Sequence, residues 1–177
     1  MKTRIISACV MLPLLILVYL GGYQLMAAAF LVGAIGLREF YQGFEAAETK
    51  PCGPIGYTAL VELNLAFPSD LRFVMVWIVL VVMASMIYGF NVEERKLQDM
   101  TATLLGILYV VFFSFHIVLI DQTADSDLIW LVFLAAFGTD IMAYFVGMAI
   151  GKHKLCPHLS PKKSKEGAVG GVLGSVL

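Results

Sequence analysis

The sequence predicts an all-α membrane protein, a polytopic bundle of about six transmembrane helices followed by the start of a seventh. Two observations carry this prediction. Hydrophobic residues make up 60% of the 177 residues and charged residues only 14%, whereas about a quarter of a typical soluble domain is charged. Several apolar runs also approach the length of about 20 residues that a helix needs to cross the hydrocarbon. No linker interrupts these runs, so residues 1–177 are predicted to form a single transmembrane domain.

The spans are predicted at residues 5–20, 23–37, 55–67, 73–90, 100–120 and 128–150. The first follows Lys2 and Arg4 but has no small-residue cleavage site, which indicates an uncleaved span and not a signal peptide. The third is short, contains Glu62 and lies between Pro54 and Pro68, so a tilted or re-entrant segment stays open as an alternative.

Residues at the ends and centres of the other spans have simple structural interpretations. In "LREFYQ", Phe40 and Tyr41 are interpreted as aromatic anchors at the membrane surface. His116, alone in the fifth span, is expected to be hydrogen-bonded inside the bundle. Residues 167–177 read "GAVGGVLGSVL", with glycines at the four-residue spacing that allows close helix packing. The chain is therefore expected to end within a seventh span, and a homodimer through these faces is a possible partner interaction.

The distribution of basic residues predicts the orientation. If all six segments cross and the N-terminus is cytoplasmic, eleven of the twelve lysines and arginines lie on the cytoplasmic side and only Arg72 lies on the other. This is the asymmetry of the positive-inside rule. The net charge of −1 gives no reason to expect nucleic acid as a partner.

Asp140, about midway through the sixth span, is the first candidate for chemistry. A carboxylate at that depth costs several kcal/mol unless it faces water or a partner, so a metal ligand or proton site is the favoured interpretation. Helical spacing predicts that Asp140, Tyr144, Gly147 and Gly151 share one stripe. The alternative is a buried aspartate that neighbouring hydroxyls such as Thr139 satisfy.

The decapeptide "HLSPKKSKEG", residues 158–167, is the second candidate. It joins the sixth span to a glycine-rich helix start, where lysines and backbone N–H groups can converge on a phosphate. Lys162 and Lys163 supply charge, Ser160 and Ser164 supply hydroxyls, and Glu166 can cap the new helix or hold a hydrated cation. A solvated basic loop that only sets topology is an equally good explanation of its composition.

Other metal and hydrolase signatures are weak or missing. His153, Cys156 and His158 are spaced as H-x-x-C-x-H, but the chain has no second ligand pair, so zinc is not expected there. The sequence contains no P-loop, GxSxG or HExxH motif.

Residues 140–171, "DIMAYFVGMAIGKHKLCPHLSPKKSKEGAVGG", resemble the phosphatidate cytidylyltransferases, or CDP-diacylglycerol synthases. The resemblance implies a multi-pass enzyme of the cell inner (cytoplasmic) membrane in phospholipid biosynthesis. Such an enzyme joins CTP to phosphatidic acid, with Mg²⁺ or another divalent cation, and releases pyrophosphate. It implies catalytic or metal roles for Asp140, Lys162, Lys163 and Glu166, and substrate contacts by the residues Tyr144, Lys152, Ser160 and Ser164.

Two departures from the family pattern shape these expectations. Members commonly carry Thr-Trp where this chain has Ser164 and Lys165. The family's C-terminal signature, where its main metal ligands are expected, would lie beyond residue 177, so we expect this chain alone to catalyse little. Three alternatives stay open: a transporter that uses Asp140 for a proton or cation, a noncatalytic membrane fragment, and a CTP-dependent lipid kinase.

Overall fold

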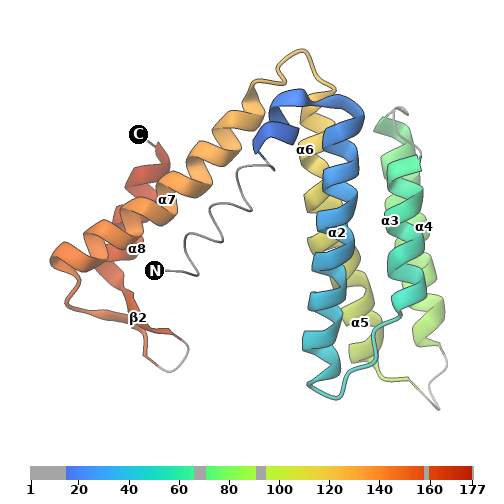
Figure 1. Ribbon diagram of the computed structural model, residues 1–177. Coiled ribbons are helices and arrows are strands. Elements are labelled where there is room, and N and C mark those ends of the chain that lie inside the picture. The colour runs from blue at the N-terminus through green and yellow to red at the C-terminus, as the bar shows by residue number, and fades with distance from the viewer. Residues whose placement is uncertain (1–14, 66–70, 91–94, 158–159, 177) are drawn as a thin grey trace. The chain divides into compact units, whose positions relative to one another are not determined.

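The structure is a computed structural model that describes residues 15–65, 71–90, 95–157 and 160–176. These residues are mostly helical and form two compact units, residues 1–123 and 124–177 (Figure 1).

The first unit is a bundle of antiparallel helices. Its main helices are α2 (Gly22–Glu45), α3 (Gly53–Leu65), α4 (Leu71–Gly89), α5 (Leu97–Leu105), the π-helix η1 (Gly106–Phe112) and α6 (Phe113–Asp121). The last three follow one another without a break, so residues 97–121 form one long helix with a π-helical centre. Residues 15–20 are also helical and precede α2.

Two glycines make the joint before α2. Gly21 and Gly22 have φ values of 62° and 55°, a conformation that only glycine adopts at low cost. The N–H of Gly22 donates to the carboxylate of Asp121 at 2.8 Å, and a Cβ on Gly21 would lie 2.7 Å from the same carboxylate. The start of α2 is therefore tied to the end of α6.

Apolar side chains from α2, α3, α4 and the long helix fill the core of this unit. The indole N–H of Trp77 donates to the carbonyl of Ala59 at 3.2 Å and links α4 to α3. The core consists of the following residues: Leu37, Tyr41, Ala59, Leu60, Leu63, Trp77, Val81, Ile107, Val111, Phe115 and Val118.

The second unit is a helical hairpin with a small sheet at its turn. Helix α7 (Leu128–Ile150) leads into strands β1 (Lys154–Cys156) and β2 (Ser160–Ser164), which pair antiparallel, and α8 (Lys165–Val176) returns along α7 (Figure 1). Glycines allow the two helices to touch through their backbones. A Cβ on Gly167 would lie 2.8 Å from the carbonyl of Ala143, and one on Gly170 would lie 2.5 Å from Cβ of Val146.

Three helical stretches of the described residues are long and apolar enough to cross a membrane: Arg72–Gly89, Leu97–Asp121 and Leu128–Ile150. They correspond to the fourth, fifth and sixth predicted spans, and α7 has the predicted bounds. The second predicted span is part of a longer helix, α2, and the third is the 13-residue helix α3. Residues 5–14 of the first lie outside the described residues.

The all-α prediction omitted the β-hairpin. Its strands have only three and five residues, and the second carries a proline and two lysines, a composition that gives no alternating pattern. The predicted helix after the decapeptide is confirmed, since α8 begins at Lys165. The glycines that suggested a dimer pack between α7 and α8, and the homodimer stays a prediction.

Candidate functional site

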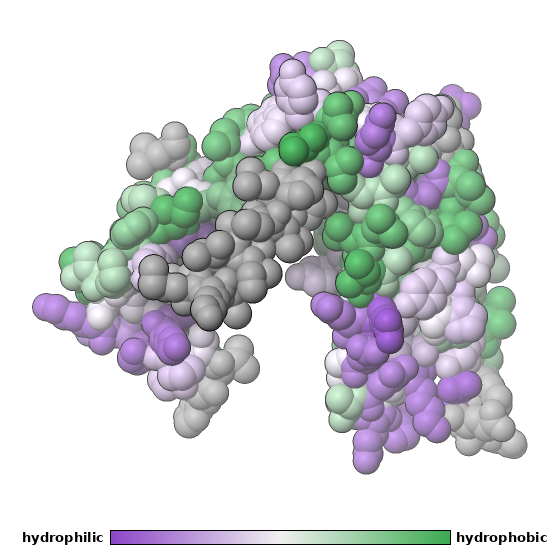
Figure 2. All heavy atoms as spheres, in the orientation of Figure 1, coloured by the Kyte–Doolittle hydropathy of each residue, from purple (hydrophilic) through white to green (hydrophobic). Residues whose placement is uncertain are grey.

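The β-hairpin of the second unit brings most of the predicted site residues together. Lys152 precedes β1, Ser160, Lys162 and Lys163 lie on β2, and Ser164 ends that strand where α8 begins. Hydrophilic side chains gather over this hairpin, whereas the adjacent helices are largely hydrophobic (Figure 2). Two local contacts explain why the segment adopts this shape.

Ser164 is the first of these contacts. Its side chain is buried, and its hydroxyl accepts the N–H of Gly167 at 3.1 Å, which caps the N-terminus of α8. The hydroxyl fits into a corner between glycines, because a Cβ on Gly151 would lie 2.6 Å from it and one on Gly147 would lie 3.1 Å from it. The hydroxyl that the sequence offered to a substrate thus anchors the helix.

Glu166 is the second contact. Its carboxylate accepts the backbone N–H groups of Lys152 at 3.2 Å and His153 at 3.2 Å, and it lies 2.6 Å from Nδ1 of His153. The hydrogen bond from the imidazole, supported by backbone N–H groups, lowers the pKa of Glu166 to about 2. The backbone N–H of Lys165 also donates to the carbonyl of His153 at 2.9 Å. Glu166 therefore clamps the end of α7 to the start of α8.

The lysines of the hairpin project from this frame. Lys152, Lys162 and Lys163 are exposed, and Ser160 is half-buried. Lys154 and Lys165 are exposed as well, whereas Glu166 is the one carboxylate in residues 152–157 and 160–166. The excess of positive charge on a backbone held by these hydrogen bonds suits a phosphate or polyphosphate ligand.

Asp140 lies apart from the hairpin. It is exposed on the flank of α7, ten residues before the last residue of that helix, or about 15 Å along the axis at 1.5 Å per residue. Tyr144 is also exposed, at 51%, whereas Gly147 and Gly151 face Ser164. The predicted stripe is thus divided between the surface and the contact with α8.

The alternative interpretation, a buried Asp140 that the Thr139 hydroxyl satisfies, does not agree with the structure. Thr139 donates to the carbonyl of Ala135 at 2.7 Å within the same helix. Within the described residues the Asp140 carboxylate is exposed and makes no hydrogen bond. An exposed carboxylate on an apolar helix fits contact with water, a lipid headgroup or another part of the protein.

The candidate metal ligands of the sequence do not form a cluster in the described residues. These residues contain no group of three or more histidine, cysteine or acidic side chains that could hold an ion. Asp140 alone would supply one carboxylate. Nδ1 of His153 is taken by Glu166, and Cys156 is a free, exposed thiol. His158 of the H-x-x-C-x-H pattern lies outside the described residues.

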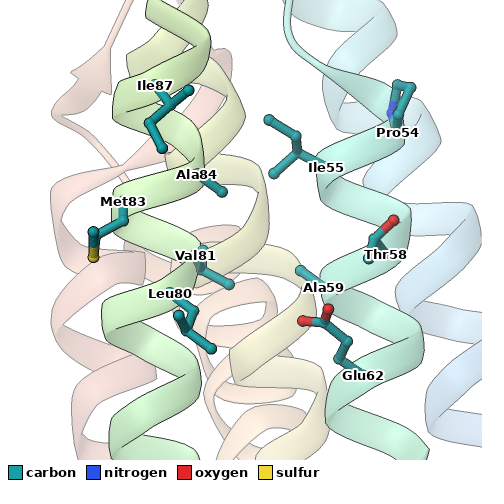
Figure 3. Close-up of a pocket in the computed structure, with 10 residues that line it drawn as sticks. All are labelled: Pro54, Ile55, Thr58, Ala59, Glu62, Leu80, Val81, Met83, Ala84 and Ile87. Atoms are coloured by element: carbon teal, nitrogen blue, oxygen red, sulfur yellow. The ribbon is translucent and has the colours of Figure 1, made fainter.

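A groove in the first unit is a poor site for phosphate. It has a volume of about 500 Å³ and lies between α3 and α4, with Glu62 reaching from α3 toward α4 (Figure 3). Its lining is apolar apart from Thr58 and Glu62, and it contains no lysine or arginine. A triphosphate would meet a carboxylate there and no cation, so the hairpin of the second unit is the better candidate.

A polar network in the first unit was not predicted from the sequence. Tyr41 is 4% exposed, and its hydroxyl donates to the carbonyl of Thr103 at 2.9 Å, so its interpretation as a surface anchor is wrong. Asp99 accepts the N–H of Lys50 at 2.6 Å and that of Lys96 at 2.9 Å. The sequence signal for this cap is an acidic residue, Asp99, in the first turn of the helix.

Thr103 and His116 make further hydrogen bonds in the first unit. The hydroxyl of Thr103 accepts the N–H of Cys52 at 2.7 Å and donates to the carbonyl of Asp99 at 2.7 Å. These bonds fix the connection between α2 and α3 against the start of the long helix. His116 contacts the carbonyl of Phe112 through Nδ1 at 2.8 Å, which confirms the expected hydrogen bond inside the bundle.

Comparison with known proteins gives this geometry its context. Residues 2–177 match the model of the Cytidylyltransferase family. The chain belongs to this family. The match extends over both units, so the basic hairpin and the helix bundle are parts of one cytidylyltransferase sequence.

Several curated relatives are phosphatidate cytidylyltransferases. The chain is 30% identical to that of Staphylococcus epidermidis over 99% of this chain and 67% of the relative. It is 32% identical to that of Pseudomonas aeruginosa over 97% of this chain and 66% of the relative. The relative from Thermotoga maritima is 26% identical over 100% of this chain and 66% of the relative. The chain thus spans about two thirds of the length of these cytidylyltransferases.

Proposed function

We propose that this cytidylyltransferase transfers the cytidylyl group of CTP to the phosphate of phosphatidic acid. The observation that carries the proposal is the basic β-hairpin, whose lysines are exposed on a frame fixed by Ser164 and Glu166. The family match and the named relatives support the same reaction.

The chemistry requires that two polyanions meet. An oxygen of the lipid phosphate attacks the α-phosphorus of CTP, the bond from that phosphorus to the β-phosphate oxygen breaks, and pyrophosphate leaves with the electron pair. The attacking phosphate is already anionic, so no strong base is needed. Lys162 and Lys163 offset the repulsion and stabilise the charge that develops on the transferred and leaving groups.

The other predicted residues take different parts in the proposal. Ser160 begins β2 and Lys152 lies at the other end of the hairpin, next to Glu166. Both residues contact phosphate oxygens in the proposal. Ser164 and Glu166 position the hairpin through their contacts with Gly167, Lys152 and His153. Asp140 and Tyr144 line the membrane-facing path of the lipid substrate on the flank of α7.

A divalent cation belongs to the proposal as the counter-ion that CTP carries. The described residues supply no cluster of ligands for it, so no step above depends on a resident metal. Mg²⁺ suits this role because it commonly binds through substrate phosphates, water and one or two carboxylates.

The distribution of charged residues supports a location for the proposed reaction. We place the hairpin on the cytoplasmic side of the inner membrane, together with the N-terminus, in a protein that crosses the membrane about six times. The positive-inside asymmetry supports this orientation, and CTP is a cytoplasmic nucleotide. The three long apolar helices supply the membrane anchorage.

The position of the label in CTP tests the proposal. The protein expressed from its complete gene is reconstituted in vesicles with phosphatidic acid, and CTP labelled at either the α- or the γ-phosphorus is added. We expect the α-label in the lipid and the γ-label in free pyrophosphate, in equal amounts.

Each other outcome contradicts the proposal in its own way. Transfer of the γ-label to the lipid would identify a lipid kinase. No transfer of either label by correctly inserted protein would remove the enzyme assignment for this chain, and proton or cation flux that depends on Asp140 would then identify a transporter.

A further inference from the structure

The backbone N–H, the carbonyl and the Nδ1 atom of His153 all make hydrogen bonds to residues at the start of α8. Its backbone N–H and its Nδ1 both contact the Glu166 carboxylate, and its carbonyl accepts the N–H of Lys165. The side chain is nevertheless 74% exposed. The imidazole is therefore fixed through one edge and open at the other.

The open edge carries Nε2. Within the described residues Nε2 makes no hydrogen bond, because the one side-chain contact of His153 is through Nδ1. The Glu166 carboxylate lies 2.6 Å from Nδ1 and can only accept a hydrogen bond, so Nδ1 carries the hydrogen of this contact. The imidazolium form has two N–H groups, one for the carboxylate and one for an external acceptor.

The side chains near His153 indicate which kind of acceptor suits its Nε2–H group. Lys152 and Lys154 flank His153 in sequence, Lys165 is hydrogen-bonded to its carbonyl, and all three side chains are exposed. The residues 152–157 and 160–166 contain no carboxylate except Glu166, which Nδ1 already occupies. An anion is the ligand that this environment favours.

We propose that His153 is a further binding residue of the site, with Nε2–H donating to a phosphate oxygen of a substrate while Glu166 positions the ring. The inference rests on the proposed function, and the phosphate belongs either to CTP or to phosphatidic acid. The arrangement is like that of metal-binding histidines, which carboxylates orient through the second ring nitrogen, with a phosphate in place of the metal.

A pair of substitutions separates binding from positioning. In His153→Asn, the amide N–H can replace Nδ1–H toward Glu166 but does not reach the position of Nε2. In His153→Gln, the longer side chain can place its amide near Nε2 but gives up the geometry toward Glu166. Cys156→Ser, on the same hairpin and exposed, serves as the matched control.

Steady-state kinetics with each substrate varied separately provides the test, in the protein expressed from its complete gene. We expect His153→Asn to raise one KM about tenfold with little change in Tm, the effect of losing one charged hydrogen bond. A rise in the KM for CTP assigns the contact to the nucleotide, and a rise in the KM for phosphatidic acid assigns it to the lipid. Glu166→Gln, which keeps an acceptor but removes the charge, should give a smaller rise.

Other results overturn the inference. Unchanged KM and kcat in His153→Asn, while wild-type protein is active, would reject the phosphate contact and leave the proposed function intact. Losses in both histidine variants that follow a fall in Tm would make His153 purely structural. An inactive wild-type protein would reject the proposed function itself, and this inference with it.

Discussion

Single residues in the basic hairpin divide into those that hold the frame and those that project from it. The sequence assigned Ser160, Lys162, Lys163 and Ser164 to a phosphate, and Glu166 to a helix cap or a hydrated cation. In the structure the hydroxyl of Ser164 is hydrogen-bonded to Gly167, and the carboxylate of Glu166 to the backbone of Lys152 and His153. The sequence alone does not show whether a serine or a glutamate contacts a substrate or supports the backbone. The folded hairpin shows which contact each side chain makes.

Glu166 gives the hairpin a defined pH dependence. Its pKa lies at about 2, below the usual value of 4.5, so its contribution to stability is fully present above pH 4.5 and is lost as the pH falls toward 2. We expect the His153 amide to lose hydrogen-exchange protection over that window. The Glu166→Gln variant should show little change in protection there. Equal acid sensitivity of wild-type protein and this variant would mean that the clamp does not hold the hairpin.

Among the elements, the pair α7 and α8 shows what glycine spacing predicts. The small residues at four-residue intervals correctly indicated close helix packing. The helix that packs against α8 is α7 of the same chain. The β-hairpin between them was missed, because its short strands follow from the contacts of Ser164 and Glu166 and not from a residue pattern.

Gly170 tests this packing. A Cβ at that position would lie 2.5–2.8 Å from the side chain of Val146, so Gly170→Ala forces the two helices apart. We expect a loss of about 1–3 kcal/mol in the free energy of unfolding, the usual cost of overpacking, measured by denaturant titration in micelles. Ala168→Val, on an exposed position of the same helix, should change stability far less. A neutral Gly170→Ala would show that α7 and α8 do not pack as described.

At the scale of the whole molecule, hydropathy predicted the fourth to sixth spans well, since each is a long helix with few charges. Hydropathy could not predict how the side chains of α2 and α3 pack inside the bundle. Tyr41 has an aromatic ring suited to the membrane surface, but the glycines at 56 and 106 leave room for it inside the bundle: a Cβ on Gly56 would lie 2.6 Å from its hydroxyl. Such a fit depends on residues far apart in sequence. The single domain and six crossings stay predictions.

The proposed topology can be measured with one thiol. Cys156 is exposed on the hairpin, which we place in the cytoplasm. With Cys9 and Cys52 changed to serine, a membrane-impermeant maleimide should label inverted vesicles and leave right-side-out vesicles unlabelled. Labelling in right-side-out vesicles would place the hairpin on the opposite side and contradict the proposed access to CTP.

The central claim is that the lysines of β2 bind the substrate phosphates, and the initial rate of CDP-diacylglycerol formation with Lys162→Ala and Lys163→Ala tests it most directly. Lys96→Ala, which removes an exposed lysine from the other unit, is the matched control for charge. We expect each β2 variant to lower kcat/KM at least tenfold with normal membrane insertion, and the control to stay within about twofold of wild type. Wild-type rates in both β2 variants would reduce the hairpin to a topology signal and contradict the account.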